Sequence, residues 1–173
     1  PPPNRPHPQR HRCPRRHRYA RRRRLKRSLR QSARAVIPTI ISQALQGSTV
    51  KLGSLSPTRD LTFVRDTVRG FLAIASSNQA IGQTTNVGTG SAISIGDLAL
   101  RIGQLMGKKL ELVADEQRVR PESSEVFELL CDNRKASERT GWEPVTSLDE
   151  GLKETIEWVA ANAHRFKSSI YNV

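Results

Sequence analysis

Apolar side chains recur along the chain with two different periods from residue 33 onward. A spacing of three and four residues predicts amphipathic helices with one buried face. Such helices are predicted over residues 36–46, 66–76, 95–106, 133–139 and 148–163. Shorter apolar runs predict strands over residues 49–53, 59–64, 83–88 and 109–113. The pattern is that of a mixed α/β domain.

Capping residues mark where several of these helices begin and end. Ser147 is followed three residues later by Glu150, a pair in which the hydroxyl and the carboxylate each bind a free backbone N–H at a helix start. Ser94 and Asp97 repeat the arrangement with aspartate in place of glutamate. Gly47 is placed to end the first helix, because glycine readily leaves the helical conformation.

Charge divides the chain into two unequal parts. The first acidic residue is Asp60, so residues 1–59 carry 16 of the 29 lysines and arginines and no acid. The remaining residues hold the other 13 basic residues and all 16 acids, so their net charge is 13 − 16 = −3. The formal charge of +13 is therefore a property of one end, and residues 60–173 show no electropositive footprint for nucleic acid.

Residues 1–29 consist mainly of proline, arginine and histidine, with little apolar surface to bury. Such a segment cannot offset the entropy lost on ordering, so we expect a disordered tail over residues 1–29 and one folded domain over residues 30–173. Several origins of the tail are open. It is a genuine arginine-rich arm for nucleic acid or an acidic membrane surface, a targeting peptide, which scarce serine and abundant proline disfavour, or the product of a shifted reading frame or a misplaced start.

Several classes of protein are not indicated by the sequence. Cys13 and Cys131 are too few for a disulfide framework or a four-ligand zinc site, and both are expected to be free thiols. No apolar run approaches the ~20 residues that cross a bilayer, and the first residues lack the apolar core of a secretory signal. We therefore expect a cytoplasmic protein with no metal site and no membrane partner.

The run from Arg59 to Asp66 joins a strand pattern to the start of a helix. Leu61 and Phe63 share one face of the extended part. Arg59 stands at its leading end, where a planar guanidinium with five N–H donors can pair bidentately with a phosphate or a carboxylate. A surface ion pair between Arg59 and Asp60 is the alternative interpretation.

Two segments together resemble a known family: SARAVIPT at residues 32–39 and LGSLSPTRD at residues 52–60. They resemble the substrate-binding lobe of extended short-chain dehydrogenase/reductases that act on nucleotide sugars, and most of all the NAD-dependent UDP-N-acetylglucosamine 4,6-dehydratases. The resemblance covers about residue 30 to the end. It implies an α/β fold, the C-terminal substrate-binding lobe of such an enzyme, without the N-terminal Rossmann core and preceded by the disordered basic tail.

The resemblance implies three substrate-binding residues. The family arginine that matches Arg59 grips the nucleotide diphosphate, and Arg120 lies in the loop where the family places a second arginine on it. Asn86 falls at a strand end that the family assigns to nucleotide-sugar binding, although an Asx turn explains an asparagine there as well. Arg118 competes with Arg120 for the second position.

The chain lacks two features that the resemblance leads one to expect. Family members bind NAD through a glycine-rich turn after the first strand and use a Tyr-x-x-x-Lys pair in catalysis. No such turn occurs here, and neither Tyr19 nor Tyr171 has a lysine at that spacing. We therefore predict no catalytic residue in this chain and no NAD binding by it alone, although NAD serves the intact family.

The sequence thus predicts the C-terminal part of an NAD-dependent nucleotide-sugar 4,6-dehydratase or epimerase, from a family that includes lyases. It is expected to bind the nucleotide diphosphate, to be inactive alone, and to have lost the homodimer of the family. Two alternatives are open: a nucleic-acid-binding protein that acts through the arginine-rich N-terminus, and a non-catalytic partner of a full-length relative.

Overall fold

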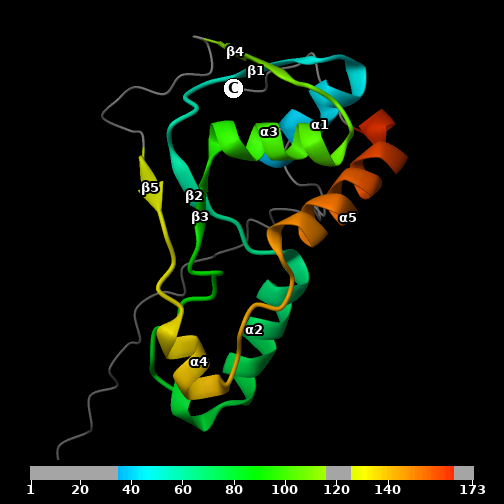
Figure 1. Cartoon of the computed structure of the whole chain (residues 1–173). Helices are drawn as coiled ribbons and strands as arrows, with labels where there is room; N and C mark the ends of the chain where they lie inside the picture. The colour runs from blue at the N-terminus through cyan, green and yellow to red at the C-terminus, as the bar shows by residue number, and fades with distance from the viewer. Residues whose placement is uncertain (1–34, 116–125, 166–173) are drawn as a thin grey trace, which may run out of the picture.

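The computed structural model describes residues 35–115 and 126–165 (Figure 1). The helices are α1 (Val36–Gln46), α2 (Val64–Ser76), α3 (Ile95–Leu105), α4 (Arg134–Thr140) and α5 (Leu148–Ala161). The strands are β1 (Thr49–Leu52), β2 (Thr58–Asp60), β3 (Ala92–Ser94), β4 (Glu111–Ala114) and β5 (Glu128–Leu129). The tail over residues 1–29 and the domain boundary at residue 30 lie outside the described residues and stay predictions.

Two small sheets connect segments that are distant in the sequence. β1 pairs in parallel with β4, and Val50 lies opposite Leu112. In the second sheet β2 is central, antiparallel to β3 and parallel to β5, so that Arg59 lies opposite Ile93 on one side and Leu129 on the other. Figure 1 shows α1, α3 and α5 at one end of the molecule and α2 and α4 at the other, with the second sheet between them.

The hydrophobic core lies at the end where α1, α3 and α5 meet β1. Its largest fully buried side chains are Ile40, Ile41, Val50, Leu98, Ile102, Leu152 and Val159. All but Val50 come from the apolar stripes whose helical spacing predicts these three helices. Gly151 lets α5 approach the start of α2 closely, because a Cβ at this position would lie 2.9 Å from a ring carbon of Phe63.

Helix positions and capping residues are confirmed. Both ends of each predicted helix lie within two residues of the ends of an observed helix. The Ser147 hydroxyl accepts a bond from the Glu150 N–H while the Glu150 carboxylate accepts one from the Ser147 N–H, which completes the predicted capping box. Ser94 likewise accepts a bond from the Asp97 N–H at the start of α3. These signals are local, and local signals are read well from sequence.

The strand predicted over residues 83–88 is wrong. No strand forms there, because no neighbouring strand in the described ranges is available to pair with it. β3 and β5 form instead, and neither was predicted from the sequence. The strand predicted over residues 59–64 is shorter than expected: β2 ends at Asp60, and α2 already begins at Val64.

A buried carboxylate ties α2 to the segment that precedes α5. The Asp66 side chain is 1% exposed and accepts hydrogen bonds from the backbone N–H groups of Thr146 (2.9 Å) and Val145 (3.3 Å). Arg69 completes the set with an ion pair to Asp66 at 2.7 Å. Burial alone would raise the pKa of Asp66, but these hydrogen bonds outweigh it and hold the pKa below its usual value.

Trp142 adds a second link at the same place. Its indole N–H donates to the Asp66 carbonyl at 3.1 Å, and the ring packs beside Gly70, where a Cβ would lie 3.3 Å from the indole. α2 is thus held to the rest of the molecule through a polar, inward-facing side. Asp66 does not stand out in the sequence, because an acid in the first turn of a helix is ordinary there.

Replacing Asp66 by Asn should lower the free energy of unfolding by about 1.5 to 3 kcal/mol, the range for hydrogen bonds to a charged group. The amide retains one oxygen but turns an N–H₂ group toward backbone donors. Urea unfolding measures the change. The matched control is Asp132→Asn, an exposed carboxylate paired with Arg134, for which a much smaller change is expected because solvent screens the pair. Equal losses in both variants would contradict the role of Asp66.

The pH dependence of this contribution has a definite sign. Because the folded-state pKa of Asp66 lies below the ordinary 3.8, its stabilisation is fully present above that value and is lost as the pH falls through the folded-state pKa. The difference in melting temperature between the wild type and Asp66→Asn should therefore be constant at neutral pH and shrink below about pH 4. Thermal unfolding from pH 7 to pH 3 tests this, and a difference that grows with acid would contradict it.

Candidate nucleotide-binding site

Arg59 lies in the middle of β2, half-buried, between β3 and β5. Its Nη1 donates to the carbonyl of Thr58 at 2.8 Å and to the carbonyl of Val126 at 2.7 Å. Val126 is the residue at which the described chain resumes before β5. Two carbonyls on one nitrogen fix the plane of the guanidinium, which is therefore held by the backbone rather than left to rotate.

The neighbouring Asp60 binds backbone groups of other segments. Its Oδ1 accepts from the Thr89 N–H at 3.0 Å and from the Thr89 hydroxyl at 2.6 Å. Its Oδ2 accepts from the Gly90 N–H at 2.8 Å and from the Cys131 N–H at 3.3 Å. This carboxylate therefore joins β2 to the turn at residues 88–90 and to Cys131, which follows β5. From the sequence, Asp60 was considered only as an ion-pair partner of Arg59.

Asn86 is exposed and precedes the turn that Asp60 holds. The Asx turn that was its alternative explanation does not form, since the Asn86 side chain makes no hydrogen bond to another residue in the described ranges. The turn itself is fixed from its other side by Asn133, whose Nδ2 donates to the Gly88 carbonyl at 2.9 Å. Asn86 thus precedes a turn that Asp60 holds next to β2, the strand that also carries Arg59.

Arg120, the third predicted contact, and its competitor Arg118 lie outside the described residues, which stop at residue 115 and resume at residue 126. The choice between the two arginines therefore stays a prediction. Their segment returns to the described structure at Val126, and the Val126 carbonyl is the group that binds Arg59.

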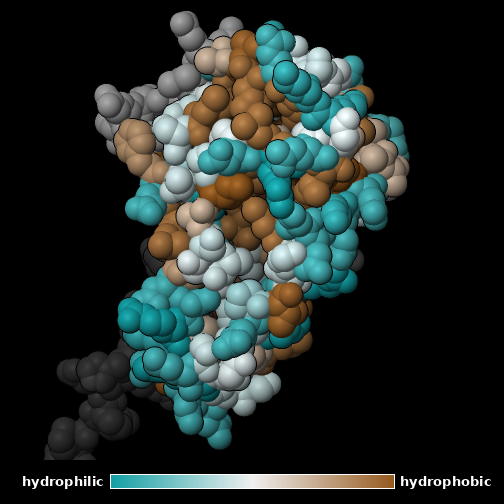
Figure 2. All heavy atoms as spheres, viewed as in Figure 1, coloured by the Kyte–Doolittle hydropathy of each residue, from teal (hydrophilic) through white to brown (hydrophobic). Residues whose placement is uncertain are grey.

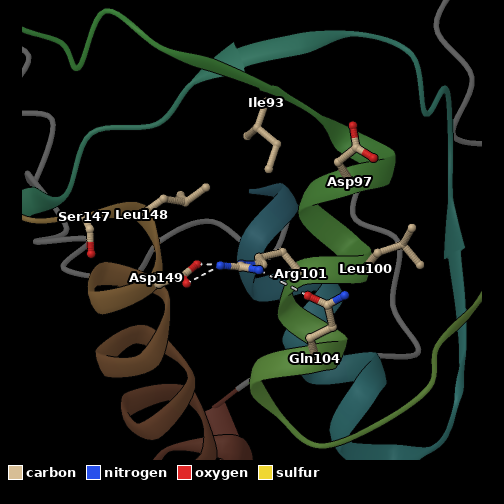
Figure 3. Close-up of a pocket in the computed structure, with 8 residues that line it drawn as sticks. All are labelled: Ile93, Asp97, Leu100, Arg101, Gln104, Ser147, Leu148 and Asp149. Carbon is tan, nitrogen blue, oxygen red and sulfur yellow. Dashed lines mark hydrogen bonds and ion pairs between the residues drawn. The ribbon is translucent and has the colours of Figure 1, made fainter.

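A hollow of about 540 Å³ opens elsewhere, between α3 and the start of α5 (Figure 3). Arg101 reaches across it and pairs with the Asp149 carboxylate through two nitrogens, and its Nη1 also donates to Gln104 at 3.3 Å. The hydrogen bonds from Arg101 hold the pKa of Asp149 below its usual value. These polar groups satisfy one another, so we interpret the hollow as a structural contact between two helices.

A second hollow, of about 360 Å³, adjoins the first and shares Ile93, Ser147 and Leu148 with it. Neither hollow is lined by Arg59 or Asn86. On the face shown in Figure 2, apolar surface is concentrated over the end that carries α3, with hydrophilic side chains crossing it. Arg59 and Asn86 thus lie outside these two hollows, whereas Thr89, which binds Asp60, lines the second one.

Two further properties concern only residues 35–115 and 126–165. Within them, no group of three or more His, Cys, Asp or Glu side chains gathers in a way that could hold a metal ion. None of their helices is long and apolar enough to cross a membrane.

Comparisons with known proteins identify the fold. A family model described as GDP-mannose 4,6 dehydratase matches residues 21–155. UDP-glucuronic acid decarboxylase 1 of Xenopus tropicalis is 36% identical over 130 residues, which cover 71% of this chain and 28% of that protein. The epimerase Mth375 of Methanothermobacter thermautotrophicus matches with a TM-score of 0.69 at 32% identity, over 79% of this chain and 40% of that one.

A structure that carries ligands is also similar. MoeE5, solved in complex with UDP-glucuronic acid and NAD, matches with a TM-score of 0.67 at 29% identity, over 76% of this chain and 43% of that one. Across these three proteins, the chain spans only 28 to 43% of the relatives' own length. The predicted family and the predicted fold class are confirmed, on a part of the relatives' fold. The chain belongs to the GDP-mannose 4,6-dehydratase family of extended short-chain dehydrogenase/reductases, whose members are nucleotide-sugar dehydratases and epimerases.

Proposed function

We propose that this chain is the substrate-binding part of a nucleotide-sugar 4,6-dehydratase or epimerase, and that Arg59 binds the diphosphate of the nucleotide. Asn86 and Arg120 are the further contacts in this proposal. The observation that carries it is the setting of Arg59: a guanidinium anchored on two carbonyls in the sheet of a nucleotide-sugar enzyme fold. A guanidinium held in place before the ligand arrives loses less conformational entropy on binding, which favours affinity.

Charge supports the same assignment. A nucleotide diphosphate carries several negative charges, and arginine meets phosphate oxygens with two parallel N–H bonds. A second arginine, Arg120, would neutralise the other side of the diphosphate. The nucleic-acid alternative depends on residues 1–29, which lie outside the described residues, and the comparisons lend it no support.

Three of the described helices, α2, α3 and α5, begin in a way that does not fit the pyrophosphate of NAD. In dinucleotide-binding folds a glycine-rich turn leaves the N–H groups at a helix start open to that group. Here α3 and α5 begin with serine caps and carry Asp97 and Glu150 in their first turns, where an acid repels phosphate. α2 has the buried Asp66 in the same place. We therefore assign no NAD-dependent step and no catalytic residue to this chain alone.

The outer face of α2 supports the view that the fold is incomplete. Val64, Val68, Phe71 and Leu72 are 49 to 64% exposed, whereas Asp66 and Gly70 face inward. Helices of soluble domains normally bury the apolar face and expose the polar one. Residues 84–87 form neither helix nor strand, and their backbone makes no hydrogen bond within the described ranges. We propose that the α2 face packs against the part of the fold that the longer relatives have in addition.

Arg59→Ala should weaken binding of UDP by about 10- to 150-fold, which corresponds to about 1.5 to 3 kcal/mol for hydrogen bonds to a charged group. Isothermal titration calorimetry on the purified chain measures it. Arg134→Ala is the matched control: this exposed arginine pairs with Asp132, and unchanged affinity is expected. UDP binding by Arg59→Ala as tight as by the wild type would refute the assignment.

The exposed face of α2 should make the purified chain self-associate. Phe71→Ser combined with Leu72→Ser should raise the monomer fraction in size-exclusion chromatography, because both side chains are more than 60% exposed and their loss costs little core packing. Leu100→Ser, an exposed leucine on α3, is the control and should have a smaller effect. A wild-type chain that is monodisperse and unfolds cooperatively as a monomer would contradict this expectation.

A further inference from the structure

Asp60 follows the arginine proposed to bind the ligand, and its carboxylate contacts segments that are distant in the sequence. Its carboxylate accepts four hydrogen bonds from two segments that lie 29 to 71 residues further along the chain. Three of the donors are backbone N–H groups, which any residue would supply, so the contact depends on Asp60 alone. Removing the carboxylate would leave the turn at residues 88–90 and the N–H of Cys131 without their common acceptor.

Arg59 and Asp60 bind opposite ends of the same segment, residues 126–131. Residues 126–131 contain β5, which runs beside β2. The Val126 carbonyl at the beginning of this segment binds the Arg59 guanidinium at 2.7 Å, and the Cys131 N–H at its end binds Asp60 at 3.3 Å. The carbonyl that orients Arg59 is thus part of a segment whose far end is held by the adjacent aspartate.

The turn at residues 88–90 packs closely against Cys131 and Asp60. A Cβ at Gly88 would lie 2.3 Å from the Cys131 Cβ and 3.0 Å from Asp60 Oδ2. The close approach brings the turn directly against the end of the β5 segment, with Asp60 between them. Asn86 lies two residues before Gly88, so a displacement of this turn would move Asn86 as well.

We propose that Asp60 is a positioning residue for nucleotide-diphosphate binding. It holds the turn at residues 88–90 and the segment 126–131 on β2, so that the guanidinium of Arg59 and the segment of Asn86 are presented together. The proposal rests on the proposed function and deepens it. In this proposal the two adjacent residues have different roles. Arg59 contacts phosphate, and Asp60 determines where Arg59 and its neighbouring segments lie.

Asp66 is a natural comparison, because it offers the same chemistry in a different place. It too is an aspartate that follows an arginine and accepts backbone N–H bonds from a distant segment. Its partners, Val145 and Thr146, precede α5, whereas the partners of Asp60 lie in the turn at residues 88–90 and at Cys131. A general loss of stability would affect both aspartate variants, whereas a loss of positioning would affect only Asp60.

The experiment compares UDP with UMP, which lacks the second phosphate, by calorimetric titration of the full chain and its variants. Asp60→Asn should raise the Kd for UDP about tenfold and the Kd for UMP less than twofold, so that the preference for the diphosphate falls. Asp66→Asn should leave the ratio of the two Kd values unchanged. Thr89→Val removes the 2.6 Å hydroxyl bond to Asp60 together with the two bonds of that hydroxyl to the Ser91 backbone, and it leaves the Asp60 carboxylate in place. It should raise the Kd for UDP about threefold and keeps the test decisive if Asp60→Asn does not fold.

The outcomes separate the two proposals. A wild-type chain that shows no binding of UDP refutes the proposed function and the positioning role with it. If the wild type prefers UDP but Asp60→Asn and Thr89→Val keep the same preference, the function stands and the positioning role is overturned. The positioning role is also overturned if the Asp60 variant weakens UDP and UMP equally, because that pattern marks a structural residue.

Discussion

Aspartate carboxylates that accept backbone N–H bonds hold the distant segments of this molecule together. A carboxylate taken out of water is costly unless its oxygens find donors, and backbone N–H groups of loops are donors that need partners in turn. Asp60 and Asp66 solve both problems at once. They stand at the end of β2 and in the first turn of α2, so the strand–helix unit between residues 58 and 76 is joined at two points to segments far along the chain.

The two ends of the molecule are stabilised differently. Around α1, α3 and α5 the side chains form a conventional apolar core, with Ile40, Leu98 and Leu152 almost fully buried. At the other end α2 exposes Val64, Val68, Phe71 and Leu72, and the hydrogen bonds of Asp66 and Trp142 are among the contacts that join it to the rest of the molecule. A helix with this orientation is typical of a surface that another part of a protein covers, which agrees with a chain that spans less than half of its relatives' length.

The candidate site lies between these two ends, on the small sheet that connects them. Arg59 lies on the central strand of that sheet, and its neighbours on both sides are segments that arrive from other parts of the chain. A binding residue on a strand is placed more rigidly than one on a loop, and the carbonyls of Thr58 and Val126 add to that rigidity. Affinity for a diphosphate would then depend as much on the groups that hold the guanidinium as on the guanidinium itself.

Local patterns in the sequence were enough to predict the helices, their caps, the class of fold and the family. Helical spacing and the pairs Ser94–Asp97 and Ser147–Glu150 depend on residues within one or two turns of each other, so they can be read without knowing the fold. The resemblance also selected Arg59, which the structure places on β2. Asn86 and Arg120 were selected in the same way, and the described contacts leave their roles as proposals.

The strands β3 and β5 and the roles of the two Arg-Asp pairs followed from tertiary contacts, whereas β1, β2 and β4 overlap strands predicted from the sequence. Residues 83–88 have a strand-like pattern, yet a strand exists only when a neighbour pairs with it, and here β3 and β5 pair with β2 instead. Asp60 and Asp66 look alike in the sequence, each following an arginine. Their partners come from residues 89, 90 and 131 in one case and from residues 145 and 146 in the other. Such choices are made by chain segments that meet only on folding, and no local pattern records them.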